Sequence, residues 1–316
     1  SAKLNVNDVC NDPVVMILKE KDSGALRSTL DFGWRHKARQ MLVRDVLYAA
    51  GVCNEYDYNF RAHGPQRAIE RIVEAVEADH FFWLTLDIKD CFASVKPEHL
   101  YGMTPLKGAV LKRVAFLPAS VPIQCSHTMG SIYFEQAARR GLLQGSMASG
   151  PLASALLGRE IRLVIAGHPG VVAVIYADDI AIGARTQDQI ETIKHAIGER
   201  LASLSGGPLF LKFCKIGHAN SGFDFLQRRI QRRQWNGEHD VRVQPSSGAF
   251  ERLKKKLLVQ YGDAALGIAL DQSMDGALDQ SSNEVIERIQ KWAKCSSSDD
   301  LRHLSASRSE ALAHLV

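Results

Sequence analysis

The sequence has no C-x-x-C pair and no long apolar run. Its six cysteines are scattered, which argues against a zinc site or a disulfide framework and predicts free thiols in a reducing, cytoplasmic compartment. No apolar stretch approaches the roughly 18 residues that a membrane-spanning helix needs, and the first residues lack the apolar segment of a signal peptide. We therefore expect no membrane partner.

A strong charge of one sign is also missing. The 39 basic and 35 acidic residues give a net charge of +4 over 316 residues. This small basic excess permits a nucleic-acid partner without requiring one. Apolar residues make up 46% of the chain and charged residues 23%, which predicts a soluble globular protein with room for two or three domains.

Local patterns predict alternating strands and helices. Residues 14–19 and 26–32 are typical of two strands of a hairpin. Residues 37–50 predict a helix whose apolar face comprises Leu42, Val43, Val46, Leu47 and Ala50. Residues 103–133 contain several prolines and glycines, and they predict only short helices and loops.

Two adjacent aspartates interrupt an apolar stretch at Val171–Ile182. The stretch predicts two short strands joined at Ala177-Asp178-Asp179. Neighbouring carboxylates repel each other, so one of them is pushed towards protonation unless a cation neutralises both. Mg²⁺ is the expected cation because it binds carboxylate oxygens together with substrate phosphates.

A third carboxylate, Asp87, follows the apolar run that begins at Phe81. The order of strands and helices around it is compatible with a split βαβ arrangement of the ferredoxin-like type. In such a sheet Asp87 would face the Asp178-Asp179 turn. Two Mg²⁺ ions held by three such carboxylates can activate a 3′-hydroxyl and stabilise a departing pyrophosphate.

Seven segments resemble, in family order, the motifs of reverse transcriptases of the prokaryotic lineage, which includes group II intron, retron and phage-defence enzymes. They are Lys21–Arg27 with Asp31-Phe32 (fingers hairpin), Phe60–Ile69 (second fingers motif), Leu86–Phe92 (first palm motif), Gln144–Pro151 (template and dNTP loop), Tyr176–Asp179 (catalytic box), Leu209–Lys215 (the following motif) and Phe223–Leu226 (primer grip).

The resemblance implies an α+β fold: a right-hand polymerase with a ferredoxin-like (split βαβ) palm, α/β fingers and a helical thumb. The implied boundaries are 1–80 for the fingers, 81–233 for the palm with some fingers elements in 103–140, and 234–316 for the thumb and C-terminal region. The implied activity is RNA-directed DNA synthesis, in which dNTPs are added to a primer 3′-hydroxyl.

The resemblance also implies roles for individual residues. It places two Mg²⁺ ions, with Mn²⁺ as a substitute, on Asp87, Asp178, Asp179 and the backbone carbonyl of Ile88. Lys215 would act beside these carboxylates in catalysis. Nucleotide-binding roles fall on Lys21, Arg27, Phe92, Gln144 and Gly145. A guanidinium matches phosphate geometry, and a ring at Phe92 would clash with a ribose 2′-hydroxyl and so favour dNTPs.

Basic residues follow the segment that resembles the primer grip. A run of charge is usually only a solvated face, but this position favours contacts with nucleic-acid phosphates. The predicted nucleic-acid-binding residues are Phe225, Leu226, Arg228, Arg229, Arg232, Arg233, Lys254, Lys255 and Lys256.

The expected partners are an RNA template, a DNA primer or product, and dNTPs. The compact chain resembles defence-associated enzymes, which implies a dedicated non-coding RNA and a role in bacterial anti-phage defence. A nucleotide cyclase-type palm is an alternative, disfavoured because no G-G-D/E-E-F-like loop is present. A catalytically inactive RNA-binding module is another, and the intact aspartates with Gln144 argue against it. The sequence does not indicate an oligomeric state.

Overall fold

A computed structural model describes most of the chain up to Lys255. The described residues are 12–20, 26–53, 55–59, 64–125, 131–235 and 238–253, together with Val6, Cys10 and Lys255. The chain divides into two compact units, residues 1–217 and 218–316. Within the described residues, no helix has the length and apolarity to cross a membrane.

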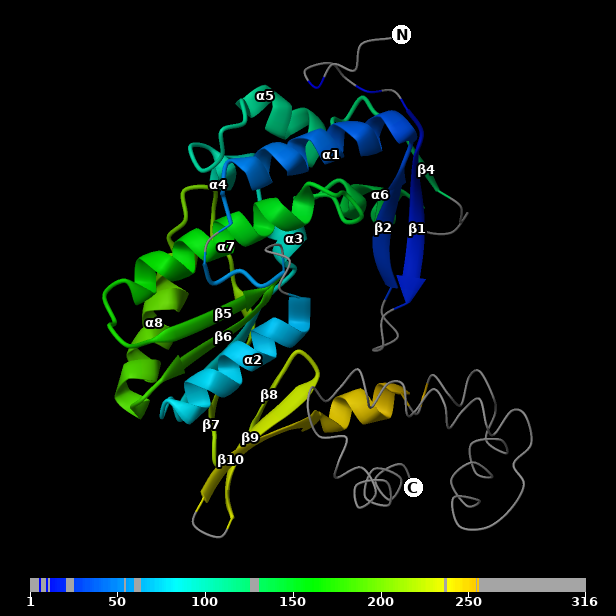
Figure 1. Cartoon of the computed structure of the whole chain (residues 1–316). Coiled ribbons are helices and arrows are strands. Elements are labelled where there is room, and N and C mark those ends of the chain that lie inside the picture. The colour runs from blue at the N-terminus through cyan, green and yellow to red at the C-terminus, as the bar shows by residue number, and fades with distance from the viewer. Residues whose placement is uncertain are drawn as a thin grey trace, which may run out of the picture. The chain divides into compact units, whose positions relative to one another are not determined.

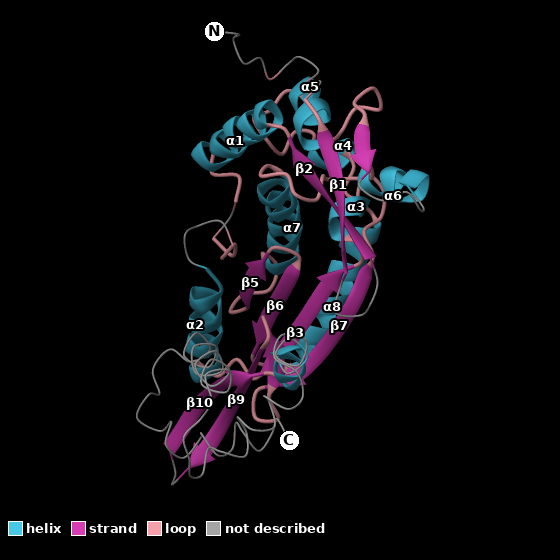
Figure 2. Cartoon of the chain, turned by 90° about the vertical axis from the view of Figure 1, so that its right-hand side faces the viewer, coloured by secondary structure: helices cyan, strands magenta, loops and turns pink. Residues whose placement is uncertain are grey.

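A four-stranded sheet organises the first unit (Figure 1). Its spatial order is β5-β6-β3-β7, and β6 runs antiparallel to both of its neighbours. Figure 2 shows β6, β3 and β7 side by side. The strands are β3 (Phe82–Ile88), β5 (Val172–Tyr176), β6 (Asp179–Ala184) and β7 (Leu211–His218).

Two long helices connect these strands, α7 (Ser149–Ile165) before β5 and α8 (Gln187–Ala202) before β7. The larger elements therefore follow the order βαββαβ, and the first strand lies between the third and the fourth. This is the ferredoxin-like arrangement. The predicted α+β class with a split βαβ palm is confirmed.

Strand β3 is mostly apolar because both of its faces are covered. Leu84, Leu86 and Ile88 belong to the same buried cluster as side chains of α7 and α8. Trp83 does not belong to this cluster but is also fully buried. It packs on Gly183 of β6, where an added Cβ would lie 2.7 Å from the indole ring. The two polar residues of β3 are Thr85, which is buried, and Asp87, which lies near the end of the strand.

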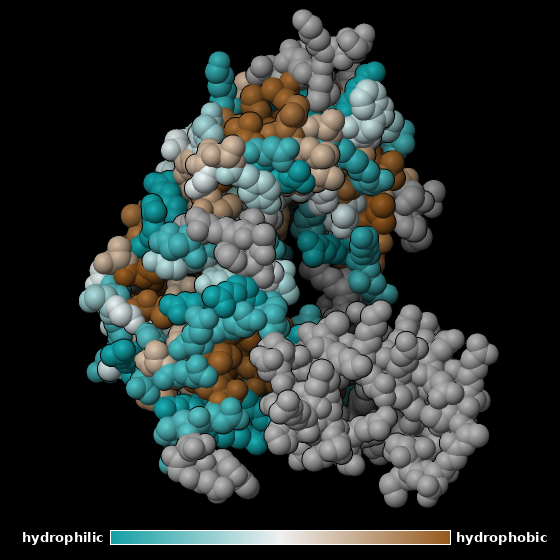
Figure 3. All heavy atoms as spheres, in the orientation of Figure 1, coloured by the Kyte–Doolittle hydropathy of each residue, from teal (hydrophilic) through white to brown (hydrophobic). Residues whose placement is uncertain are grey.

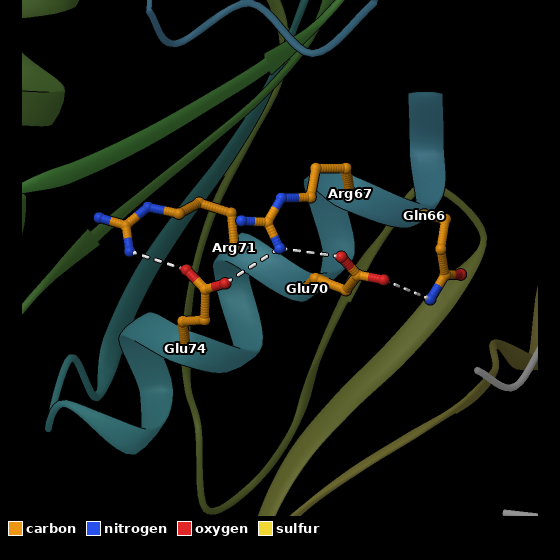
Figure 4. A network of polar contacts seen from close by, with 5 residues as sticks. All are labelled: Gln66, Arg67, Glu70, Arg71 and Glu74. Atoms are coloured by element: carbon orange, nitrogen blue, oxygen red, sulfur yellow. Dashed lines mark hydrogen bonds and ion pairs between the residues drawn. The ribbon is translucent and has the colours of Figure 1, made fainter. Parts of the chain in front are cut away.

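Helix α2 (Gly64–Glu77) packs along β5 and β6 with a purely apolar face. Its solvent-facing side carries a chain of ion pairs, shown in Figure 4. Arg67 contacts both Glu70 and Glu74, and Arg71 contacts Glu74, at 3.0–3.2 Å. Exposed pairs of this kind contribute only a few tenths of a kcal/mol each, so burial of the apolar face is what fixes the helix.

A second sheet of the first unit has the order β2-β1-β4. Its strands are β1 (Val14–Glu20), β2 (Leu26–Phe32) and β4 (Ile123–Cys125). The predicted hairpin is confirmed, with Lys19 opposite Arg27. Strand β4 was not predicted, because three residues are too few to show a period and the strand forms by parallel pairing with the distant β1.

Short helices link these sheets. They are α3 (Cys91–Ser94), α4 (Pro97–Leu100), α5 (Gly108–Val110), the short π-helix η1 (Leu111–Ala115) and α6 (Ser131–Ala138). The prediction of short helices and loops for residues 103–133 is confirmed apart from strand β4. Residues 126–130 lie outside the described part of the chain.

Helix α1 (Trp34–Ala49) corrects the predicted apolar face. Val43 and Leu47 are buried, but Leu42 is 47% and Val46 44% exposed. On the buried side of the helix, polar side chains lie where Leu42 and Val46 were expected. One of them, Arg39, donates a hydrogen bond to the Val6 carbonyl at 2.7 Å. Figure 3 shows hydrophobic side chains at the surface in the upper part of the picture, where α1 and α5 lie in Figure 1.

The second unit contains an antiparallel sheet of order β10-β9-β8. Its strands are β8 (Phe223–Phe225), β9 (Arg228–Trp235) and β10 (Glu238–Pro245). The basic run after the primer-grip-like segment therefore lies in strand β9, and β10 follows it at the start of the region 234–316. Residues 247–253 and 255 are helical, and residues 236–237, 254 and 256–316 lie outside the described part of the chain.

One ion pair across the first unit gives a prediction about stability. Glu160 of α7 is 2% exposed and accepts a hydrogen bond from Arg200 of α8, while the Nε of a second cation, Arg159, lies 3.6 Å from Glu160 Oε1. We expect Arg200→Ala to lower the free energy of unfolding by about 2 kcal/mol, because it leaves a buried carboxylate poorly compensated.

Urea unfolding followed by circular dichroism measures this effect. Lys194→Ala, which removes only the exposed pair with Glu191, is the matched control and should cost less than about 0.5 kcal/mol. Equal losses in the two variants would show that the buried pair does not hold α7 against α8.

Candidate active site

The turn between β5 and β6 is a two-residue hairpin loop. Tyr176 pairs with Asp179, so Ala177 and Asp178 form the loop itself. Ala177 has φ 57°, whereas Asp178 keeps a negative φ. This pattern is that of a type II′ turn, whose first central position normally holds glycine. A side chain there is strained, and such strain persists only where surrounding structure imposes it.

Antiparallel pairing brings a third carboxylate to this turn. Asp87, near the end of β3, is the register partner of Asp179 on β6. Directly opposed residues have Cβ atoms about 5 Å apart, and like charges at such positions destabilise a sheet. The predicted convergence of Asp87 with the Asp178-Asp179 turn is therefore found in the structure.

Electrostatics at the turn show the effect of gathering these charges. Partial burial and then the negative charges of Asp178 and Asp87 raise the pKa of Asp179 to about 6. Burial and the charge of Asp87 also raise the pKa of Asp178. Burial, followed by the same carboxylates, raises the pKa of the nearby Cys91 thiol to about 12. The site therefore carries negative charge that favours a cation.

Lys212 of β7 supplies a cation that sequence reasoning missed. Its Nζ lies 2.7 Å from Asp87 Oδ2, and this hydrogen bond raises the pKa of Lys212. Lys215, the lysine predicted to be catalytic, lies instead beside Thr85, whose Oγ1 donates to the Lys215 carbonyl at 3.4 Å. Lys215 is exposed, and in the described residues its ammonium forms no ion pair.

The donor chemistry fits a divalent metal, because carboxylate oxygens are the ligands that Mg²⁺ prefers. The described residues nevertheless contain no group of three acidic, histidine or cysteine side chains placed to hold a metal as they stand. The Lys212 ammonium donates a hydrogen bond to one oxygen of Asp87 and supplies positive charge where a metal ion would. Ile88, whose carbonyl was predicted as a further ligand, directly follows Asp87 and has a buried side chain.

Predicted nucleotide-binding residues meet at the loop before α7. Arg27 Nε of β2 donates to Gln144 Oε1 at 2.5 Å, and the Leu30 N–H donates to the Gln144 carbonyl at 2.8 Å. Gly145 has φ 102°, and an added Cβ would lie 2.2 Å from the Leu30 carbonyl oxygen. Only glycine fits this approach of two backbones. The positive charge of Arg27 also opposes the rise in the pKa of Asp178, so Arg27 acts on the same site.

Phe92 lies in α3, five residues after Asp87, and its side chain packs partly against the main core. Its carbonyl accepts from the Leu142 N–H at 2.7 Å. Gly141 comes so close that a Cβ there would lie 2.1 Å from the same carbonyl oxygen. The backbone of Phe92 is thus held against the loop that carries Gln144. Lys21 lies outside the described residues.

The predicted primer-grip residues lie at a strained turn of the second unit. Phe225 pairs with Arg228, which leaves Leu226 and Gln227 as the loop, with φ 46° and 64°. Two positive φ values define a type I′ turn, which normally contains Asn-Gly. Leucine and glutamine there cost about 1–2 kcal/mol each in isolation. Strain of this kind clusters at functional sites.

Two of the predicted basic residues of β9 form polar contacts with neighbouring side chains. Arg229 pairs with Asp224 at 3.2 Å, and Arg233 donates to Gln231 at 3.2 Å. A cavity of about 370 Å³ is lined by Asn220, Gln231, Arg232, Arg233, Gln234 and His239. Lys255 is an exposed helical residue, while Lys254 and Lys256 lie outside the described part of the chain.

A protein-family model described as reverse transcriptase (RNA-dependent DNA polymerase) matches residues 18–227. Apo telomerase from Candida tropicalis, truncated from its C-terminal domain, is 11% identical, with a TM-score of 0.49 and coverage of 71% of this chain and 54% of that one. Telomerase from Candida albicans with a fragment of telomeric RNA is 12% identical, with a TM-score of 0.48 and coverage of 98% and 56%. The chain thus spans about half the length of either. It matches no curated protein.

The raised pKa of Asp179 predicts a pH dependence of stability in the absence of metal. Between about pH 4 and pH 6 the folded protein binds more protons than the unfolded chain, so its stability falls as the pH rises. Asp179→Asn removes this contribution. Because Asp179 is partly open to solvent, which screens the repulsion, we expect the free energy of unfolding to rise by only about 1 kcal/mol at pH 8, and this gain vanishes near pH 4.

Thermal unfolding in a metal chelator across this pH range measures the gain. Asp188→Asn, at the exposed start of α8, is the control and should show no comparable trend. A gain that is the same at pH 4 and pH 8 would contradict a raised pKa at Asp179.

Proposed function

The chain belongs to the reverse transcriptase (RNA-dependent DNA polymerase) family, and on this premise we propose that it adds dNTPs to a primer 3′-hydroxyl on an RNA template. One observation carries the proposal. Asp87 and Asp179 are register partners beside the Asp178 turn, inside the segment that the family model matches. Neither folding nor a purely structural hairpin requires like charges at opposed positions.

Asp87, Asp178 and Asp179, with the Ile88 carbonyl, would hold two Mg²⁺ ions, for which Mn²⁺ can substitute. When bound, such ions activate the attacking hydroxyl and stabilise the departing pyrophosphate. Burial, together with repulsion from the neighbouring carboxylates, raises the pKa values of Asp178 and Asp179. A divalent cation relieves that repulsion, which supports this role. Lys215 is the proposed cation for the leaving group.

Arg27 and Gln144 would hold the incoming nucleotide. The Arg27 guanidinium suits a triphosphate, since it can donate two parallel hydrogen bonds to phosphate oxygens. Its bond to Gln144 orients it, and the close backbone approach at Gly145 fixes the loop that carries Gln144. Lys21 is proposed to assist. The position of Phe92 five residues after Asp87 supports a role beneath the sugar.

The second unit would hold the primer and template through their phosphates. This role is supported by four guanidinium groups along strand β9, which can bind phosphates. They belong to Arg228, Arg229, Arg232 and Arg233. Phe225 and Leu226, at the strained turn, would touch the primer. Lys254, Lys255 and Lys256 are proposed to add phosphate contacts. Such contacts position a duplex and do not read its sequence.

We propose that the template is a dedicated non-coding RNA and that the enzyme acts in the bacterial cytoplasm in anti-phage defence. The support is the resemblance of the motifs to prokaryotic, defence-associated reverse transcriptases, together with free thiols at the five described cysteines. Sequencing of the nucleic acid that co-purifies with the protein tests this. A single enriched RNA with its complementary DNA is the expected result, and a random sample of cellular RNA would contradict it.

The catalytic assignment predicts the effect of removing the paired aspartates. Asp178→Ala combined with Asp179→Ala should reduce dNTP incorporation on an RNA template to background, because the metal loses two of its three carboxylates. Primer extension with Mg²⁺ measures the activity, and circular dichroism confirms that the variant is folded.

The charge-matched control is Asp188→Ala combined with Glu191→Ala on α8, which should extend the primer like the unaltered chain. Primer extension by the Asp178/Asp179 variant at more than background would refute the assignment of these residues.

The sugar-selection role predicts a change of substrate preference. Phe92→Val should raise rNTP incorporation relative to dNTP incorporation by about tenfold or more, because the space for a 2′-hydroxyl opens. Single-nucleotide extension with each substrate gives the ratio. Phe116→Val shortens another half-buried phenylalanine on the same core and serves as the control. An unchanged ratio in an active Phe92 variant would mean that Phe92 only packs against the core.

A further inference from the structure

Lys212 lies directly beside Asp87 because of how β7 pairs with β3. The Lys89 N–H donates to the Phe210 carbonyl at 2.7 Å, and Thr85 contacts the Lys215 carbonyl. Between these two points, Lys212 Nζ lies 2.7 Å from Asp87 Oδ2. The contact therefore follows from the register of two neighbouring strands.

The pair combines a fixed carboxylate with a movable cation. The Asp87 side chain is 22% exposed at the end of a buried strand, while the Lys212 side chain is 65% exposed. A lysine side chain has a flexible four-carbon stem, so its ammonium can move away from Asp87 without any movement of the backbone. Among the described residues, this is the one ion pair that involves Asp87, Asp178 or Asp179.

Lys212 occupies one of the two Asp87 oxygens that can bind a divalent metal. Mg²⁺ requires close, nearly octahedral oxygen ligands, and the ammonium takes one lone-pair direction of Oδ2 and the space beside it. A positive charge beside the site also repels an approaching metal ion.

We propose that Lys212 is an internal counter-ion of the carboxylate site, which holds Asp87 in the absence of metal and competes with the divalent metal for it. Metal binding releases Lys212 into solvent. Lys212 thus acts through Asp87 as a positioning residue and sets the metal concentration at which the site fills. The inference rests on the proposed function, because it takes the carboxylates as metal ligands.

Binding of Mn²⁺ alone to the full chain, without nucleic acid, tests the proposal. The concentration of free Mn²⁺ is measured by electron paramagnetic resonance. Lys212→Met should bind Mn²⁺ about two- to tenfold more tightly than the unaltered chain, since the competing cation is gone. Lys212→Arg keeps the positive charge and should bind Mn²⁺ like the unaltered chain.

Lys215→Met is the matched control, because it removes the same charge from the same strand without touching a carboxylate. It should leave the Mn²⁺ affinity unchanged. Equal affinity in the two methionine variants, or weaker binding by Lys212→Met, would overturn the proposal. Tighter binding by Lys212→Met alone would support it.

A measurement on the unaltered chain covers the case in which Lys212→Met does not fold. Lysines are acetylated briefly with and without Mn²⁺, and the modified positions are identified by mass spectrometry. Release from Asp87 should raise the labelling of Lys212 relative to that of Lys215. A ratio that Mn²⁺ does not change would overturn the proposal.

The same titration separates this inference from the proposed function. If Asp178→Ala combined with Asp179→Ala leaves Mn²⁺ binding unchanged, the metal does not bind at the carboxylates and both ideas fail. If that variant loses Mn²⁺ binding while Lys212→Met behaves like Lys215→Met, only the role of Lys212 fails.

Discussion

Repulsion among carboxylates at one end of a sheet is the constraint on which this structure depends. The antiparallel register of β3 and β6 places Asp87 opposite Asp179, and the two-residue turn adds Asp178. A fold selected for stability alone would place opposite charges or apolar groups there. The surrounding structure must therefore hold the strands in register by other means. The fully buried Trp83, Leu84 and Ile182 do so further along the same two strands.

Glycines tie the rest of the predicted site to this sheet. Gly145 lets the loop before α7 lie against the Leu30 carbonyl of β2, and Gly141 lets the same loop lie against α3. The loop thus joins the residues near Arg27 to the residues that follow Asp87. Any side chain at either glycine would separate two backbones, so both contacts require the absence of a Cβ.

The sequence predicted the parts of the site that local pattern encodes. Asp87 ends an apolar run, and Asp178-Asp179 lies between two short strands, so strand and turn patterns were sufficient. Lys212 was missed because the choice between it and Lys215 depends on the register of β7 against β3, which no local pattern contains. The exposed Leu42 and Val46 of α1 were wrongly assigned to the core, because apolar spacing alone cannot report that Arg39 and Gln40 face inward.

Backbone strain marks two places where local preference and structure disagree. Ala177 and the Leu226-Gln227 pair adopt positive φ values that glycine or asparagine would adopt at lower cost. A sequence free to minimise strain would carry those residues, so the non-glycine side chains imply a requirement other than the turn itself. At Ala177 the methyl group makes the turn stiffer than glycine would, which restricts movement of Asp178 away from Asp87 and Asp179. Glycine would satisfy the φ value but would also let the carboxylate move away from its neighbours, and the electrostatics favour that movement until a cation binds.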